Sequence, residues 1–153
     1  MADPLPDGPL LGVDPGTVRV GVAASTILGT IHPVGFLDAE PREAMLKNLA
    51  TLAQNRDSVG IVVGLPINMD GTEGPAAKAA RKLGAEIAKA TGLPVAFADE
   101  RLTSHAAEIA LAPMQLTRKK KKARTDAVAA ALLLETYISD RAAKRPPKPE
   151  TDA

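Results

Sequence analysis

Residues 10–24 read LLGVDPGTVRVGVAA, and this stretch decides the fold. An apolar run ends in the carboxylate of Asp14, turn-forming residues follow, and residues 19–24 alternate in the manner of a β-strand. Two strands joined by so short a turn form an antiparallel hairpin. Local sequence leaves two interpretations of Asp14 open, namely a turn former and a catalytic carboxylate.

The rest of the chain alternates strand and helix patterns. We expect a strand around 32–37, a helix over 41–56, a buried strand over 58–64, a loop over 65–74, a helix over 75–91, a strand over 94–98, a helix from Thr103 or Ser104 to about 111, and a helix from Thr125 to about 138. Helical crossovers make the last two strands parallel to the third. The predicted fold is α/β, with a single mixed five-stranded sheet flanked by helices. The predicted domain covers residues 10–139, between a flexible lead-in at 1–9 and a flexible basic, proline-rich tail at 140–153.

Composition excludes several classes of protein. With 153 residues, 45% hydrophobic and 24% charged, the chain suits one globular domain rather than a disordered one. It has no cysteine, which excludes disulfides, a thiolate nucleophile and cysteine-based metal sites. The two histidines, His32 and His105, lie too far apart in sequence to form a zinc site by themselves. With no long apolar run and no signal-peptide pattern, we expect a cytoplasmic protein without a membrane partner.

Charge is unevenly distributed along the chain. Residues 1–117 carry 9 Lys and Arg against 13 Asp and Glu, whereas residues 118–153 carry 10 against 5. A basic end of this kind suggests a polyanionic partner. Aromatic residues are only 2%, which argues against a base-stacking platform. We therefore expect any nucleic acid to be bound through its phosphates and through a metal.

Three carboxylates are placed where an α/β sheet presents its ligands. Asp14 ends the first strand, Glu100 follows the last strand, and Asp126 is expected to open the final helix, where the helix dipole favours its ionised form. Converging carboxylates suit Mg²⁺, and two such ions about 3.5–4 Å apart can drive phosphodiester hydrolysis. Taken singly, Glu100 and Arg101 are better explained as a surface ion pair, and Asp126 can be an ordinary carboxylate at a helix N-terminus. Their joint placement favours the functional interpretation.

A basic run leads directly into Asp126. Its cations are Arg118, Lys119, Lys120, Lys121, Lys122 and Arg124. Their mutual repulsion predicts a mobile segment that suits a long polyanion, and the alternative is a solvated linker. Further predicted nucleic-acid contacts are Thr17, Arg19, Asn68, Arg101 and Thr103, with Arg101 nearest the scissile phosphate. For Asn68, a hydrogen bond to its own loop backbone is the competing interpretation.

Four sequence blocks carry a resemblance to a known family. They are LLGVDPGTVRVGVA (10–23), IVVGLPINMDGTEGP (61–75), FADERLTSHAAE (97–108) and RTDAVAAALLLETYI (124–138). The chain resembles the YqgF family, the RuvX-type pre-16S rRNA nucleases, formerly described as Holliday junction resolvases. This resemblance implies an RNase H-like fold, with Asp14, Glu100 and Asp126 as catalytic acids that bind Mg²⁺ or Mn²⁺. RuvC-type relatives offer a further carboxylate one turn after the third acid, where this chain has Ala129 and Ala130.

Four functions compete on these observations. The favoured one is a metal-dependent endonuclease acting on structured RNA, in 5′-end maturation of pre-16S rRNA; the second is a resolvase of four-way DNA junctions. The third is an ATP-binding phosphate loop like that of actin-like ATPases and sugar kinases, which need two such lobes where this chain has room for one. The fourth is a non-catalytic binding module, which would be expected to lack one of the acids. The sequence leaves the oligomeric state open.

Overall fold

A five-stranded mixed sheet forms the centre of the computed structural model, which describes residues 5–101 and 118–144 and, over 118–125, the backbone alone. The strands are β1 (Leu10–Asp14), β2 (Arg19–Ser25), β3 (Ile31–Asp38), β4 (Gly60–Leu65) and β5 (Val95–Asp99). Their order is β3-β2-β1-β4-β5. β2 runs antiparallel to both β1 and β3, whereas β4 runs parallel to both β1 and β5. The predicted mixed sheet is therefore confirmed, and β1, β4 and β5 all end at the same edge.

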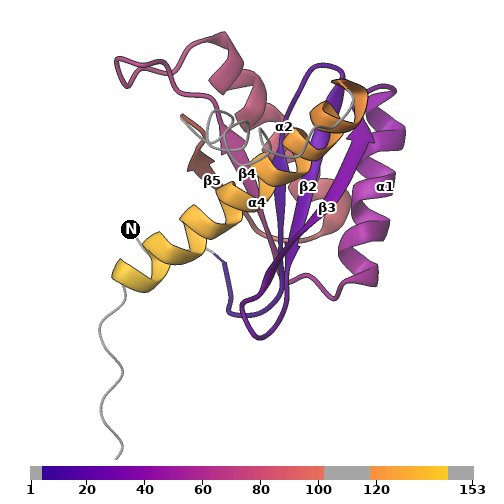
Figure 1. Cartoon of the computed structure of the whole chain (residues 1–153), viewed down its shortest axis with the longest axis vertical. Helices are drawn as coiled ribbons and strands as arrows, with labels where there is room; N and C mark the ends of the chain where they lie inside the picture. Colours follow the sequence, from indigo (N-terminus) through magenta and orange to yellow (C-terminus); the bar gives the residue numbers. More distant parts are fainter. Residues whose placement is uncertain (1–4, 102–117, 145–153) are drawn as a thin grey trace, which may run out of the picture.

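Helices cover both faces of this sheet (Figure 1). On one face, α1 (Arg42–Asn55) and α2 (Pro75–Thr91) pack over the inward side chains of the strands, with Met45, Leu49 and Ile87 fully buried. On the other face, α4 (Arg118–Lys144) crosses the strands diagonally and buries Leu133 and Leu134. The sheet is therefore sandwiched between two helical layers, as the α/β pattern predicts.

The last helix is longer than its sequence predicts. We expected it to begin at Thr125 after a mobile basic run, whereas α4 begins at Arg118 and continues to Lys144. Lys, Arg and Ala are strong helix formers, and repulsion between neighbouring like charges costs only about 0.2–0.5 kcal/mol per pair. Asp126 consequently lies about two turns inside the helix, where the dipole of the N-terminus has little effect. The dipole argument for its ionised form is wrong.

The lead-in also differs from its expected flexibility where it is described. The Leu5 side chain is 3% exposed and belongs to the cluster of apolar residues beneath α4. The backbone N–H of Val59 donates to the carbonyl of Pro9 at 2.8 Å, which extends the pairing of β1 with β4 to the residues before both strands. The composition of residues 1–9 does not indicate this packing, because a single apolar side chain among prolines holds the segment in place. The helix predicted over 103–111 lies outside the described residues.

Within the described part of the chain, no helix combines the length and apolarity that a membrane span requires.

Candidate active site

Strand alternation places the first two predicted acids on the same face of the sheet. Leu10 packs beneath α4, so Gly12 and Asp14, at steps of two along β1, face the same helix. Ala96 and Ala98 of β5 also face α4, and Glu100 continues that alternation just beyond the strand. Both carboxylates therefore emerge at the carboxyl-terminal edge, on the α4 side.

A glycine in β4 makes room between these two acids. Gly64 lies on the strand between β1 and β5, paired with Ala98. A Cβ atom at Gly64 would lie 2.5 Å from Glu100 Oε2 and 3.4 Å from the Cδ of Pro15. The Glu100 carboxylate thus lies across the bare backbone of β4, toward the residue that follows Asp14.

Asp14 and Glu100 share a hydrogen bond, and their protonation is linked. Burial above all, then the hydrogen bond to Asp14 and the charge of that residue, together raise the pKa of Glu100 to about 8. Burial raises the pKa of Asp14 as well, while the hydrogen bond from Glu100 opposes the rise and the charge of Asp126 adds to it. At neutral pH the pair therefore holds one proton, with Glu100 as donor and Asp14 as acceptor.

A second glycine brings Asp126 to the same place. Gly21 of β2 is the register partner of Asp14, and a Cβ atom on Gly21 would collide with the carbonyl oxygen of Asp126. α4 therefore touches the sheet backbone directly beside Asp14. The side chain of Asp126 forms a salt bridge with Arg19, with Nε and Oδ2 3.0 Å apart. The three acids predicted from the sequence lie together at one edge of the sheet.

The donor chemistry of this site fits a divalent cation, although its present arrangement does not enclose one. Three carboxylates offer the hard oxygen ligands that Mg²⁺ and Mn²⁺ prefer. Across residues 5–101 and 118–144, no three His, Asp or Glu side chains are arranged to hold a metal ion as they stand. Asp14 and Glu100 are joined by their proton and Asp126 is drawn to Arg19. For these three carboxylates to hold a metal together, that proton would have to leave and the Asp126 side chain would have to turn from Arg19.

Two of the other predicted nucleic-acid contacts, Arg101 and Asn68, form hydrogen bonds within the protein. Arg101 donates from its backbone N–H and from Nε to the carboxylate of Asp99, at 2.9 and 2.7 Å, so its ion-pair partner is Asp99. The Asn68 side chain donates to Thr72 Oγ1 at 3.1 Å, and its backbone N–H donates to the Thr72 carbonyl at 2.9 Å. Thr17 is exposed in the turn between β1 and β2. Thr103 lies outside the described residues, and a nucleic-acid contact by any of these residues stays a prediction.

Comparison with known proteins identifies the family. The profile of the RuvX family, described as Holliday junction resolvase, matches residues 8–140. The chain belongs to the RuvX family. It is 40% identical over 132 residues to a protein of Anaeromyxobacter sp. (strain Fw109-5) named "Putative pre-16S rRNA nuclease", covering 86% of this chain and 96% of that one. A Lactococcus lactis protein of the same name is 41% identical over 138 residues, covering 88% and 96%.

A solved structure supports the same assignment of fold for this RuvX-family chain. Thermus thermophilus RuvC in complex with a Holliday junction substrate superposes with a TM-score of 0.55 at 14% sequence identity. The match covers 88% of this chain and 96% of RuvC. At this identity the likeness shows the fold, and the RNase H-like architecture predicted from the sequence is confirmed.

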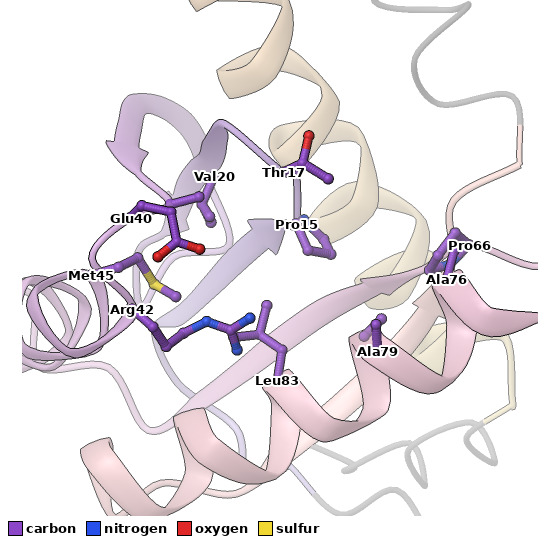
Figure 2. A pocket seen from close by; sticks show the side chains of 13 residues that line it. Pro15, Thr17, Val20, Glu40, Arg42, Met45, Pro66, Ala76, Ala79 and Leu83 are labelled. Atoms are coloured by element: carbon purple, nitrogen blue, oxygen red, sulfur yellow. The ribbon is translucent and has the colours of Figure 1, made fainter.

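Sequence reasoning missed a cavity of about 340 Å³ on the opposite face of the sheet (Figure 2). It lies between the first turns of α1 and α2 and the turn that follows Asp14, with Pro15 and Thr17 in its wall. Its lining is otherwise mostly apolar, and Arg42 in its wall donates to Glu86 of α2 at 2.8 Å. The signal was the row of small residues on α2, Ala76, Ala79 and Ala80. The RuvX-family acids lie outside this cavity, on the other side of the turn.

Proposed function

We propose that this chain is an endonuclease that hydrolyses phosphodiester bonds of structured RNA, with Mg²⁺ or Mn²⁺, in 5′-end maturation of pre-16S rRNA. The observation that carries the proposal is the meeting of Asp14, Glu100 and Asp126 at the edge where β1 and β5 end. The names of the RuvX-family relatives support RNA as the substrate.

Each acid has a role that follows from its surroundings. Asp14 and Glu100 would hold the metal from the strand ends, and Asp126 would hold it from α4. A bound divalent cation supplies Lewis acidity toward the phosphate and lowers the pKa of a coordinated water. Because Glu100 carries a proton near neutral pH, that proton has to leave before both carboxylates bind as anions.

The basic start of α4 supplies the affinity for a polyanion. Its first seven residues carry six cations and lead along the helix into Asp126. A cationic helix end that adjoins the acids suits the phosphate backbone of a long nucleic acid, whichever its sequence. Within this proposal, Thr17, Asn68, Arg101 and Thr103 contact the same strand closer to the cleaved bond.

A four-way DNA junction is the alternative substrate, which the description of the family names. The deciding experiment offers the purified protein a pre-16S rRNA leader and a four-way junction, each with Mg²⁺ and with EDTA. We expect Mg²⁺-dependent cleavage of the RNA. Cleavage of the junction alone would show that the substrate is DNA, and equal cleavage in EDTA would show that the reaction does not need a divalent metal.

The Asp14→Asn variant tests whether that cleavage belongs to this site. Asn keeps the shape of the side chain and loses its charge, so we expect cleavage to disappear while the fold is retained. Without metal, relief of carboxylate repulsion should leave the melting temperature equal or higher. Asp57→Asn is the matched control, since Asp57 lies in the loop between α1 and β4, and it should cleave normally. Near-normal turnover by Asp14→Asn would remove Asp14 from the catalytic set.

A further inference from the structure

Arg19 is held between the third acid and an aromatic ring. Its Nε lies 3.0 Å from Asp126 Oδ2, and its guanidinium carbon lies 5.1 Å from the centre of the Phe36 ring. The Arg19 side chain is only 15% exposed and that of Asp126 25% exposed. The guanidinium therefore has a fixed, largely buried position at the start of β2.

The sheet places this cation on one side of Asp126 and the other acids on the opposite side. α4 touches β2 at Gly21, with Asp126 above it. In the sheet, Gly21 lies opposite Phe36 on β3 and opposite Asp14 on β1. Asp126 thus lies between two neighbours: Arg19 with Phe36 toward β3, and Asp14 toward β1, near enough for its charge to raise the pKa of Asp14.

We propose that Arg19 is a positioning residue that competes with the divalent metal for Asp126. The proposal rests on the proposed function, because it assumes that the three acids bind a metal. While Arg19 holds Asp126, the three carboxylates do not enclose a cation. With Asp126 serving as a ligand, the guanidinium of Arg19 would lose this partner and remain as a permanent positive charge beside the site. The released guanidinium is then available to a phosphate of the bound strand.

A merely structural ion pair makes the opposite prediction. Partly exposed ion pairs contribute little to stability, and losing structural support for a ligand weakens metal binding. Losing a competitor, in contrast, strengthens it. The sign of the change in metal affinity therefore separates the two roles without any measurement of cleavage.

The first test is calorimetric titration of the full chain with Mn²⁺ at constant pH. Arg19→Gln should lower the Kd for Mn²⁺ about fivefold, the upper range for releasing one such pair. Arg19→Lys keeps the charge and should stay near wild type. Arg42→Gln is the control with the same loss of charge, since Arg42 pairs with Glu86 on the far face of the sheet, and it should change nothing. An unchanged or weakened affinity in folded Arg19→Gln overturns the proposal.

A second measurement uses the wild-type protein and does not depend on a variant that folds. The Nε–H resonance of Arg19 should shift during titration with Mg²⁺, in step with the occupancy of the metal site, while that of Arg42 stays in place. An Arg19 resonance that does not move at saturating Mg²⁺ overturns the proposal. RNA cleavage is assayed separately: competition without cleavage would contradict the proposed function alone, whereas cleavage without competition would contradict the role of Arg19 alone.

Discussion

At the scale of single residues, the shared proton of Asp14 and Glu100 distinguishes this site from a surface cluster of acids. Burial is the main cause of the raised pKa of each carboxyl, and their mutual hydrogen bond raises the pKa of Glu100 while it lowers that of Asp14. A pair of this kind favours the protonated state as long as no cation is present. The stability of the metal-free protein should therefore depend on pH.

We predict that the metal-free protein loses stability as pH rises from about 4.5 to about 8. The pKa of Glu100 is about 8 in the folded protein and about 4.5 in the unfolded chain, so across this interval the folded state binds more protons. The contribution of this carboxyl is complete below the unfolded value and is lost as pH passes the folded value. Urea unfolding in EDTA at several pH values measures the slope.

Glu100→Gln provides the control for this slope. Its amide can still donate to Asp14 and does not titrate, so the decline with pH should become shallower. A wild-type profile with the same slope as that of Glu100→Gln would show that this carboxyl is not buried as the structure has it.

At the scale of elements, glycines determine how closely α4 approaches the sheet. A Cβ atom at Gly21 would meet the backbone of Asp126, which belongs to the helix and cannot rotate away. A Cβ atom at Gly64 would meet the ends of two side chains, Glu100 and Leu133, at 2.5 and 2.9 Å. A substitution at Gly21 therefore tests where the helix lies, and a substitution at Gly64 tests where the Glu100 carboxylate lies.

We therefore predict different outcomes for two alanine substitutions. Gly21→Ala should destabilise the protein by about 1–3 kcal/mol, because α4 has to shift from its position on β2. Gly64→Ala should cost less, because side-chain ends can turn aside, yet it should displace Glu100 and abolish cleavage. Thermal unfolding and RNA cleavage of both variants are the measurements. A Gly64→Ala variant with full activity would mean that Glu100 does not act from above β4.

The elements also show how far the sequence predicts the site. Asp14 and Glu100 were placed correctly, because both follow apolar strands and the ends of parallel strands share an edge. The sequence predicts Asp126 at the start of a helix, because a run of cations is typical of a loop. In the structure the residues of the basic run belong to α4, and Asp126 lies inside that helix. The bond between Arg19 and Asp126 was missed because it joins residues far apart in the chain. Only the packing of α4 on Gly21 brings them together.

At the scale of the whole molecule, negative and positive charge are separated along α4. The helix begins with the basic run and reaches the acid site about two turns later. A substrate bound along that helix start would carry its phosphates toward the carboxylates. This arrangement suits a polymer better than a small phosphate ester, since only a polymer spans both regions.

Replacing Lys119, Lys120, Lys121 and Lys122 by alanine should weaken binding to every nucleic acid alike. The salt dependence of affinity should fall by up to about 3–4 units if each lysine neutralises one phosphate. Alanine preserves the helix, so the position of Asp126 should not change. Binding titrations over a range of salt concentrations give the slope, and an unchanged slope would reduce the basic run to a solvated helix end.

The central claim is that Asp14, Glu100 and Asp126 form one divalent-metal site. Anomalous scattering from crystals of the full chain soaked in Mn²⁺ at pH 8 tests it most directly. We predict a manganese peak within about 2.0–2.2 Å of carboxylate oxygens from all three acids, with Arg19 withdrawn from Asp126. Manganese bound elsewhere, or an intact salt bridge between Arg19 and Asp126 beside an empty cluster, would contradict it.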